Sequence, residues 1–312
     1  MVDALGDRDL FGNVHLPKAE CILKERFIVP PFSLLNAREG DWQERKRRWI
    51  SLGIKSEAGR DIDPTCVSKN VPEYMAGRGN NEGGSIFDPV LCEILYKWFS
   101  PVGGHILDPF AGGSVRGIVA SLMGRKYTGI DLREEQIIAN RKQAVEICED
   151  SPLMPQWICG DALNVPELAG GLYDFFFTCP PYGDLEVYSE DPLDLSTMDH
   201  HAFIGAYSLI IGKCCAMLRT NSFASIVVGD YRGDDGHYKN FTSDTIAAFL
   251  ASGLKLYNRA ILVTMVGSLP IRITRQFEAG RKLGNTHQDV LIFCKGDWRI
   301  AADKTKHEPL TK

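Results

Sequence analysis

The sequence predicts an α/β fold in which helices cover both faces of a mostly parallel sheet. Short apolar runs typical of buried strands alternate with segments of helical period from about residue 85 to about residue 296. Such alternation is typical of parallel strands joined by crossover helices. The clearest strand, 173–179, is rich in aromatic residues and is stopped by Pro180-Pro181, because proline has no N–H for the strand ladder. We therefore expect a seven-stranded Rossmann-like sheet that closes with an antiparallel hairpin.

The individual elements follow from the local pattern. The expected strands are 105–110, 126–132, 156–160, 173–179, 223–230, 256–266 and 290–295. The expected helices are 88–99, 115–123, 134–148, 199–218 and 243–251. Proline directly after Asp88 favours a helix start, because its fixed φ suits the first turn. No helical pattern stands between the last two strands, which predicts an edge hairpin with a long loop.

The chain is expected to contain an N-terminal arm (1–84), a main domain (85–300) and a flexible tail (301–312). In the arm, a short apolar run at 27–32 is stopped by prolines, and a helix beginning near Asp41 would carry tryptophan and arginine side chains. Glycines and asparagines at 80–85 predict a joint between arm and domain. The arm is a candidate for contact with DNA or with a protein partner.

Composition limits the class of protein. The 312 residues are 44% hydrophobic and 24% charged, which is typical of a globular chain. No run of about 18 uncharged apolar residues is present, so no membrane span is expected. The N-terminus lacks the features of a signal peptide. The nine cysteines are odd in number and none forms C-x-x-C, so reduced thiols in a cytoplasmic protein without a metal site are expected.

Charge is distributed unevenly along the chain. The formal net charge of −5 argues against a protein that coats nucleic acid nonspecifically. A nucleic-acid enzyme with this balance must concentrate positive charge locally. Two stretches do so, 44–48 and 267–282, and in the second Arg272, Arg275, Arg281 and Lys282 oppose only Glu278. Either stretch could also be an ordinary solvated helix face.

Three polar loops follow three successive strands of the expected sheet. The loop 108–114, D-P-F-A-G-G-S, places glycines directly before a helix, where the backbone can approach a ligand and free N–H groups favour an anion. Asp131 ends the next strand, about 20 residues later, where a carboxylate can accept from ribose hydroxyls. Asp161 ends the third and suits an adenine amino group. Taken singly, either acid could be a helix cap. Together they predict a pocket for an adenosine-containing cofactor, either a nicotinamide dinucleotide or S-adenosylmethionine.

The dinucleotide signature G-x-G-x-x-G is absent from the chain. The combination of D-P-F-x-G at 108–112 with C-P-P-Y at 179–182 resembles the DNA methyltransferases that act on exocyclic amino groups, N6 of adenine or N4 of cytosine. The resemblance covers about residues 85–296, and the whole chain looks like the DNA modification methylases of bacteriophages and prophages. It implies the S-adenosylmethionine-dependent methyltransferase fold, S-adenosylmethionine as cofactor and double-stranded DNA as substrate. The implied setting is DNA modification, as in restriction-modification, in the cytoplasm of a bacterial or phage-infected cell.

The same resemblance implies roles for cofactor-binding residues. Asp108, Phe110 and Gly112 would line the methionine end of S-adenosylmethionine. Asp131 would hold its ribose and Asp161 its adenine. Phe87 and Asp88 match, less closely, the place where relatives cover the carboxylate of the cofactor.

The implied catalytic turn consists of Cys179, Pro180, Pro181 and Tyr182. An exocyclic amine is a poor nucleophile because its lone pair is delocalised into the ring. Acceptors at residues 179 and 180 would hold the amino hydrogens, and the reaction would then depend on positioning the methyl group in line. Tyr182 would stack on a base rotated out of the duplex.

Cys179 departs from the family pattern, which has Asp, Asn or Ser at this position. A thiol accepts hydrogen bonds weakly, and serine is closest to it in size, which favours the T-S-P-P-Y type usually linked with cytosine N4. A covalent role for Cys179, as in C5-cytosine methyltransferases, is disfavoured because those enzymes place cysteine after the proline. The substitution Cys179→Ser distinguishes the two roles.

Several alternatives remain open at the level of sequence. The same fold could act on RNA or on a protein glutamine, and a catalytically inactive DNA-binding protein is a third reading. No segment is long enough for a large separate target-recognition domain, so the arm, the acidic segment 184–199 or the loop 267–285 would read a short recognition sequence. His287 and Gln288, before the last strand, could approach the substrate or be structural. The sequence leaves open whether the protein forms a homodimer.

Overall fold

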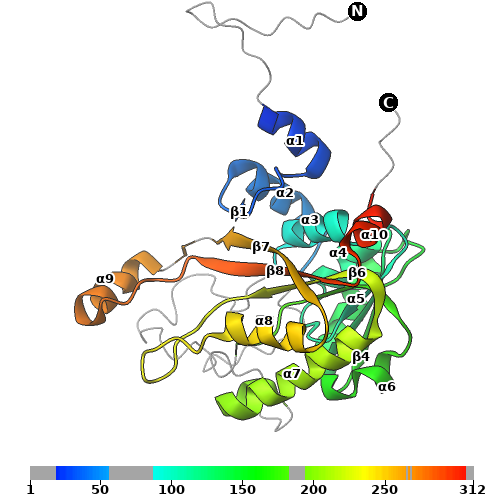
Figure 1. Cartoon of the computed structure of the whole chain (residues 1–312). Helices are drawn as coiled ribbons and strands as arrows, with labels where there is room; N and C mark the ends of the chain where they lie inside the picture. Colours follow the sequence, from blue (N-terminus) through cyan, green and yellow to red (C-terminus); the bar gives the residue numbers. More distant parts are fainter. Residues whose placement is uncertain (1–18, 56–86, 183–193, 265, 268, 307–312) are drawn as a thin grey trace, which may run out of the picture.

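A computed structural model describes residues 19–55, 87–182, 194–264, 266–267 and 269–306 (Figure 1). Its centre is a sheet in the order β1-β7-β8-β6-β5-β2-β3-β4. The strands are β1 (Leu34–Asn36), β2 (His105–Asp108), β3 (Lys126–Asp131), β4 (Gln156–Cys159), β5 (Tyr173–Thr178), β6 (Leu218–Val228), β7 (Lys255–Val263) and β8 (His287–Lys295). Within this sheet β8 alone runs antiparallel to its neighbours, β6 and β7. The predicted Rossmann-like sheet, mostly parallel and closed by an antiparallel hairpin, is confirmed.

Helices cover both faces of the sheet (Figure 1). One apolar core contains side chains of α3 (Pro89–Phe99), α4 (Val115–Leu122) and α5 (Glu134–Ile147). The other contains side chains of α6 (Val165–Ala169), α7 (His200–Met217) and α8 (Phe241–Ala251). Strand β5 serves both cores, because Phe175 and Phe177 belong to the first and Phe176 to the second. A strand buried on both faces is continuously apolar rather than alternating, as its sequence indicated.

The arm contributes an eighth strand that the sequence analysis did not predict. Strand β1 pairs in parallel with β7, with Leu35 opposite Leu262, so the hairpin strand β7 does not form the edge of the sheet. Helix α1 (Ala19–Phe27) and helix α2 (Gly40–Ile50) flank β1. The expected helix near Asp41 is α2, and it begins one residue earlier. Leu35 and Trp42 are buried in the first core, so the described part of the arm is packed on the main domain.

Hydrogen bonds fix α2 on α3. The indole N–H of Trp42 donates to the Asp88 carboxylate at 3.1 Å, and that of Trp49 donates to Glu93 at 2.8 Å. Arg45 Nε also donates to the Glu93 carboxylate, at 2.6 Å. Because these bonds join residues more than 40 positions apart, they hold the arm against the helix that begins the main domain.

Two further elements differ from expectation. Helix α9 (Leu269–Gly280) occupies the connection between β7 and β8 that was expected to be a loop, and it projects from the body of the molecule (Figure 1). Helix α10 (Trp298–Lys304) crosses the expected tail boundary at 301, and Ala301 is buried. A helix of seven residues after a strand carries too few apolar positions to show a period, so no helix was predicted there.

Some expectations concern side chains rather than elements. Seven cysteines are free thiols: Cys92, Cys148, Cys159, Cys179, Cys214, Cys215 and Cys294. In the described ranges no cluster of His, Cys, Asp and Glu side chains is arranged to hold a metal ion. None of the helices that the structure describes is both long and apolar enough to cross a membrane. The acidic residues 184–193 and the arm segments 1–18 and 56–84 lie outside the described residues.

Candidate active site

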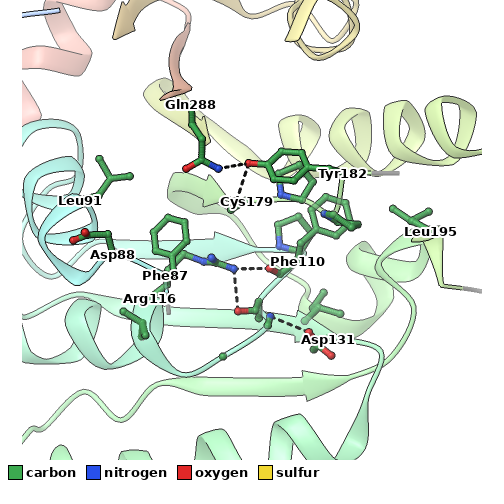
Figure 2. Close-up of a pocket in the computed structure, with 18 of the residues that line it drawn as sticks. Phe87, Asp88, Leu91, Phe110, Arg116, Asp131, Cys179, Tyr182, Leu195 and Gln288 are labelled. Carbon is green, nitrogen blue, oxygen red and sulfur yellow. Dashed lines mark hydrogen bonds between the residues drawn. The ribbon is translucent and has the colours of Figure 1, made fainter. Parts of the chain in front are cut away.

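A cavity of about 660 Å³ lies at the carboxyl ends of the parallel strands. Its wall includes the glycine turn after β2, Asp131 at the end of β3, Asp161 after β4 and the C-P-P-Y turn after β5. Figure 2 shows Phe110, Asp131, Cys179 and Tyr182 in this wall. Of the residues singled out in the sequence, Phe110, Gly112, Asp131, Asp161, Cys179, Pro180, Pro181 and Tyr182 line this one cavity. The carboxyl edge of an open α/β sheet is where ligands bind, and here it brings together both predicted motifs.

The glycine turn is held open by contacts with the neighbouring strand. Gly112 has φ +50°, a conformation that favours glycine, and no atom lies within 4 Å of the position a Cβ would take. Its N–H donates to Asp131 Oδ2 at 2.9 Å, and its carbonyl accepts from Asn140 Nδ2 at 2.7 Å. Beneath the turn, a Cβ on Gly129 would come within 2.8 Å of the Ala111 Cβ. Glycine at 129 therefore lets the turn sit close against β3.

Asp108 lies beneath this loop and does not line the cavity. Its side chain is fully buried, and it accepts from Arg116 Nε at 2.5 Å, from the Tyr127 hydroxyl at 2.6 Å and from the Thr178 hydroxyl at 2.6 Å. Arg116 also donates to the carbonyls of Phe110 and Ala111. The structure thus gives Asp108 a place among the supports of the loop rather than a place at the methionine end of a cofactor.

Asp131 and Asp161 are placed differently in the wall. The Oδ1 of Asp131 accepts from the Arg133 N–H at 3.0 Å, in addition to the bond between its Oδ2 and Gly112. Burial raises the pKa of Asp131, and the hydrogen bonds from Arg133 and Gly112 offset part of that rise. The Oδ1 of Asp161 caps a short helical turn by accepting from the Leu163 N–H at 2.8 Å. A carboxylate has about four lone-pair sites, so both acids keep acceptor capacity toward the cavity.

The C-P-P-Y turn faces the glycine turn across the cavity (Figure 2). Tyr182 receives a hydrogen bond on its hydroxyl from Gln288 Nε2 at 2.5 Å, and the Cys179 thiol lies 3.9 Å from the same oxygen. The ring of Tyr182 contacts Phe241 edge to face at a centroid distance of 6.2 Å. These contacts fix the orientation of the aromatic ring at the wall.

Two charged residues of the cavity wall and one aromatic residue behind it had no functional assignment in the sequence analysis. Arg116 lines the cavity from α4, where its guanidinium lies 4.6 Å from the ring centroid of Phe87. Lys46 reaches the cavity from α2 and pairs with Asp88 at 3.2 Å. Phe241, which supports Tyr182, belongs to α8. The 44–48 basic run was a signal for Lys46, but only the packing of the arm shows where that lysine points.

The residues present fit an adenosine cofactor with an amino-acid end. Two carboxylates with spare acceptor capacity suit ribose hydroxyls and an adenine amino group, and the open glycine turn leaves room beside them. Asp88 and Lys46 form an ion pair in another part of the wall, whose opposite charges match a zwitterionic ammonium and carboxylate. The volume is within the usual range of small-molecule sites.

Comparison with known proteins adds to this geometry. No family model matches the chain. The tRNA (guanine(10)-N2)-dimethyltransferase of Pyrococcus abyssi is 25% identical over 171 residues, which are 54% of this chain and 46% of that protein. Type II methyltransferase M2.DpnII of Streptococcus pneumoniae is 23% identical over 116 residues, which are 36% of this chain and 41% of that protein. Both relatives are methyltransferases, and the sheet described above has the S-adenosylmethionine-dependent methyltransferase fold.

The chain spans less than half the length of these two curated relatives. Among solved structures, the alignment with TrmN from Thermus thermophilus covers 67% of this chain and 49% of the TrmN chain, at a TM-score of 0.45 and 15% identity. S-adenosylmethionine is the cofactor that this fold and the similarity to a methyltransferase imply. The prediction that chose it over a nicotinamide dinucleotide is confirmed.

Proposed function

We propose that the protein transfers the methyl group of S-adenosylmethionine to an exocyclic amino nitrogen of a base flipped out of double-stranded DNA, N4 of cytosine or N6 of adenine. The observation that carries the proposal is the single cavity shared by Gly112 and Tyr182. One motif suits the cofactor and the other suits a planar base, and methyl transfer requires the two ligands to meet. A DNA modification enzyme of a phage or its bacterial host is the proposed setting.

The residues of the C-P-P-Y turn would prepare the base. Bound S-adenosylmethionine supplies an electrophilic methyl group on a sulfonium. The Pro180 carbonyl and the Cys179 thiol would accept from the amino hydrogens, which keeps the nitrogen lone pair out of conjugation. The methylated nitrogen would then carry a positive charge and lose its extra proton to water, because neither a carbonyl nor a neutral thiol is basic enough to hold it. Tyr182 would stack on the base and return roughly 1–3 kcal/mol of the few kcal/mol that flipping costs. Because Gln288 holds the Tyr182 hydroxyl, the ring is oriented before the base arrives.

Mass spectrometry of nucleosides from DNA of cells that express the protein tests the proposal directly. N4-methylcytosine or N6-methyladenine should appear with the wild type and not with Tyr182→Ala. Tyr182→Phe is the matched control, since it keeps the ring and removes the hydroxyl that contacts Gln288 and Cys179. DNA without either modified base, together with methylated RNA or protein from the same cells, would contradict the choice of substrate.

RNA is the second candidate substrate. The observation that favours it is the match to the tRNA methyltransferase, which extends over more of this chain than the match to the DNA enzyme. Transfer of a tritiated methyl group to purified duplex DNA, tRNA and total protein in parallel separates the candidates. Label in tRNA alone would establish the second.

Cys179→Ser tests how the turn acts. We expect the variant to retain methyl transfer, because a hydroxyl accepts hydrogen bonds better than a thiol and fits the same space. The rate of tritium transfer to the preferred substrate measures the effect, and cofactor affinity serves as the control for folding. Complete loss of transfer by a folded variant that binds cofactor normally would indicate a covalent thiolate instead.

A further inference from the structure

A group of basic side chains lies beside the cavity on two segments, the turn 231–240 after β6 and the segment 269–282 that contains α9. We call this group the basic rim, and it consists of Arg232, Lys239, Arg275, Arg281 and Lys282. The described acids of these segments are Asp234, Asp235 and Glu278, so the rim carries an excess of positive charge in a chain with a net charge of −5. Such a local excess is what a nucleic-acid enzyme of acidic composition requires.

The two segments form one surface. The Lys282 side chain packs on Gly236, where an added Cβ would lie 2.6 Å from its ammonium nitrogen. The Asn285 side chain donates to the Asp230 carbonyl at 3.4 Å. This bond connects the residue before the first segment with a residue just after the second. Because the two segments are in contact, their basic side chains belong to one continuous surface.

This surface continues into the cavity. Asn285, His287 and Gln288 lie shortly after the end of α9 at Gly280, and all three line the cavity. Gln288 bonds the Tyr182 hydroxyl, so only a few residues separate the basic rim from the ring that would stack on the base. Helix α9 projects outward from that point (Figure 1). If a base of a nucleic acid enters the cavity, the neighbouring part of that nucleic acid would lie against the basic rim.

Each segment of the rim presents an arginine over an exposed aromatic ring. The Arg232 guanidinium lies 3.9 Å from the ring centroid of Tyr238, and the Arg281 guanidinium lies 5.2 Å from that of Phe277. Tyr238 and Phe277 are 42% and 41% exposed. Stacking orders each planar guanidinium, and Arg232 is held further because its Nη1 donates to the Gly236 carbonyl at 3.0 Å. A guanidinium has five N–H donors, so donors remain on Arg232 for a phosphate oxygen.

We propose that the basic rim binds the phosphate backbone of double-stranded DNA beside the flipped base, with Arg232 and Arg281 as its two ordered contacts. This inference rests on the proposed function, since it assumes that a base in the cavity belongs to a nucleic acid. Phosphate contacts set orientation and affinity rather than sequence preference. The rim would therefore position the duplex, and the base in the cavity would be chosen by other residues.

Binding of a labelled DNA duplex in the presence of S-adenosylhomocysteine, measured by fluorescence anisotropy over a range of salt, tests this inference. Arg232→Gln and Arg281→Gln should each weaken binding about five- to tenfold and reduce the salt slope by about 1, because each removes one phosphate contact. Arg299→Gln is the matched control. Arg299 lies over Trp298 at 4.5 Å on α10, the same kind of pair at the opposite end of the molecule (Figure 1). Affinity for S-adenosylhomocysteine should be unchanged in all three variants, since none of these arginines lines the cavity.

The outcomes separate the inference from the proposed function. A wild type that neither binds nor methylates DNA would overturn both. A wild type that methylates DNA, with Arg232→Gln and Arg281→Gln no weaker in binding than Arg299→Gln, would overturn the rim alone. Binding of tRNA that is tighter than binding of DNA and is lost in the same two variants would replace DNA by RNA as the partner of the rim.

Discussion

At the scale of a single residue, the protonation of Asp131 should make ligand binding in the cavity depend on pH. Burial raises its pKa above the ordinary 3.8, so on acidification it takes up a proton at a higher pH than an exposed aspartate does. The raised pKa makes ionised Asp131 unfavourable for folding. Its contribution to stability is present at a pH below the pKa in the unfolded chain, and it is lost as the pH rises through the pKa in the folded protein. At neutral pH the fold thus holds a carboxylate whose ionisation is costly, which is typical of a group kept for binding.

Cofactor affinity should therefore fall on acidification. As the pH falls from neutral toward the raised pKa of Asp131, the protonated carboxyl loses acceptor capacity for ribose hydroxyls. Titration calorimetry with S-adenosylhomocysteine at decreasing pH should show weakening that begins above pH 3.8. Asp131→Asn should bind more weakly at neutral pH and show a flatter profile. A variant whose profile parallels that of the wild type would assign the pH dependence to another group.

Arg116 lines the cavity and also forms an ion pair with the fully buried Asp108, which should affect the stability of the fold. Arg116→Met should cost about 3–5 kcal/mol of unfolding free energy, because it leaves a buried carboxylate without its counter-charge. The double variant Arg116→Met/Asp108→Asn should recover part of the loss, since it removes the orphaned charge and keeps a hydrogen-bonding side chain. Urea unfolding of the wild type and the variants measures both effects. Equal stability of the single and double variants would show that the carboxylate is compensated by its hydroxyl partners, Tyr127 and Thr178.

At the scale of elements, β1 shows how three residues can anchor an arm. Leu35 is 2% exposed and its neighbour Leu34 is 57% exposed, as expected for side chains on opposite faces of a strand. Leu35→Ala should cost about 2–5 kcal/mol, because it leaves a cavity in the core, whereas Leu34→Ala should stay within about 0.5 kcal/mol. Chemical denaturation of both variants gives the comparison. Similar small effects would mean that the arm is held by its polar contacts with α3 and not by the strand.

The elements predicted from sequence are those with a strong internal pattern. The aromatic strand β5 and the polar loop after each parallel strand could be predicted, because burial on both faces and a turn at the strand end are local properties. Strand β1 could not, because three residues carry no period and their partner β7 lies more than 200 positions away. Helix α9 was missed because it is amphipathic without a core to face, with exposed Ile271 and Phe277.

The candidate site divides in the same way. Phe110, Gly112, Asp131 and the C-P-P-Y turn could be predicted to share an edge, since the ends of parallel strands meet there. Arg116 and Lys46 could not, because their place depends on how α4 and α2 pack. Asp108 shows the limit of a motif: a residue inside D-P-F was expected to line the site, and its burial under the turn is visible only in three dimensions.

At the scale of the whole molecule, the cavity wall joins three parts that are far apart in the chain. Ala37 belongs to the arm, Gly112 to the turn after β2, and His287 to the last strand. A ligand that binds only the folded wall stabilises all of it, by about 2.7 kcal/mol at a concentration 100 times the dissociation constant. Saturating S-adenosylhomocysteine should therefore slow hydrogen exchange in the arm and in β8 as well as in the glycine turn. Protection confined to 108–114 would mean that the arm and the hairpin open independently of the cofactor site.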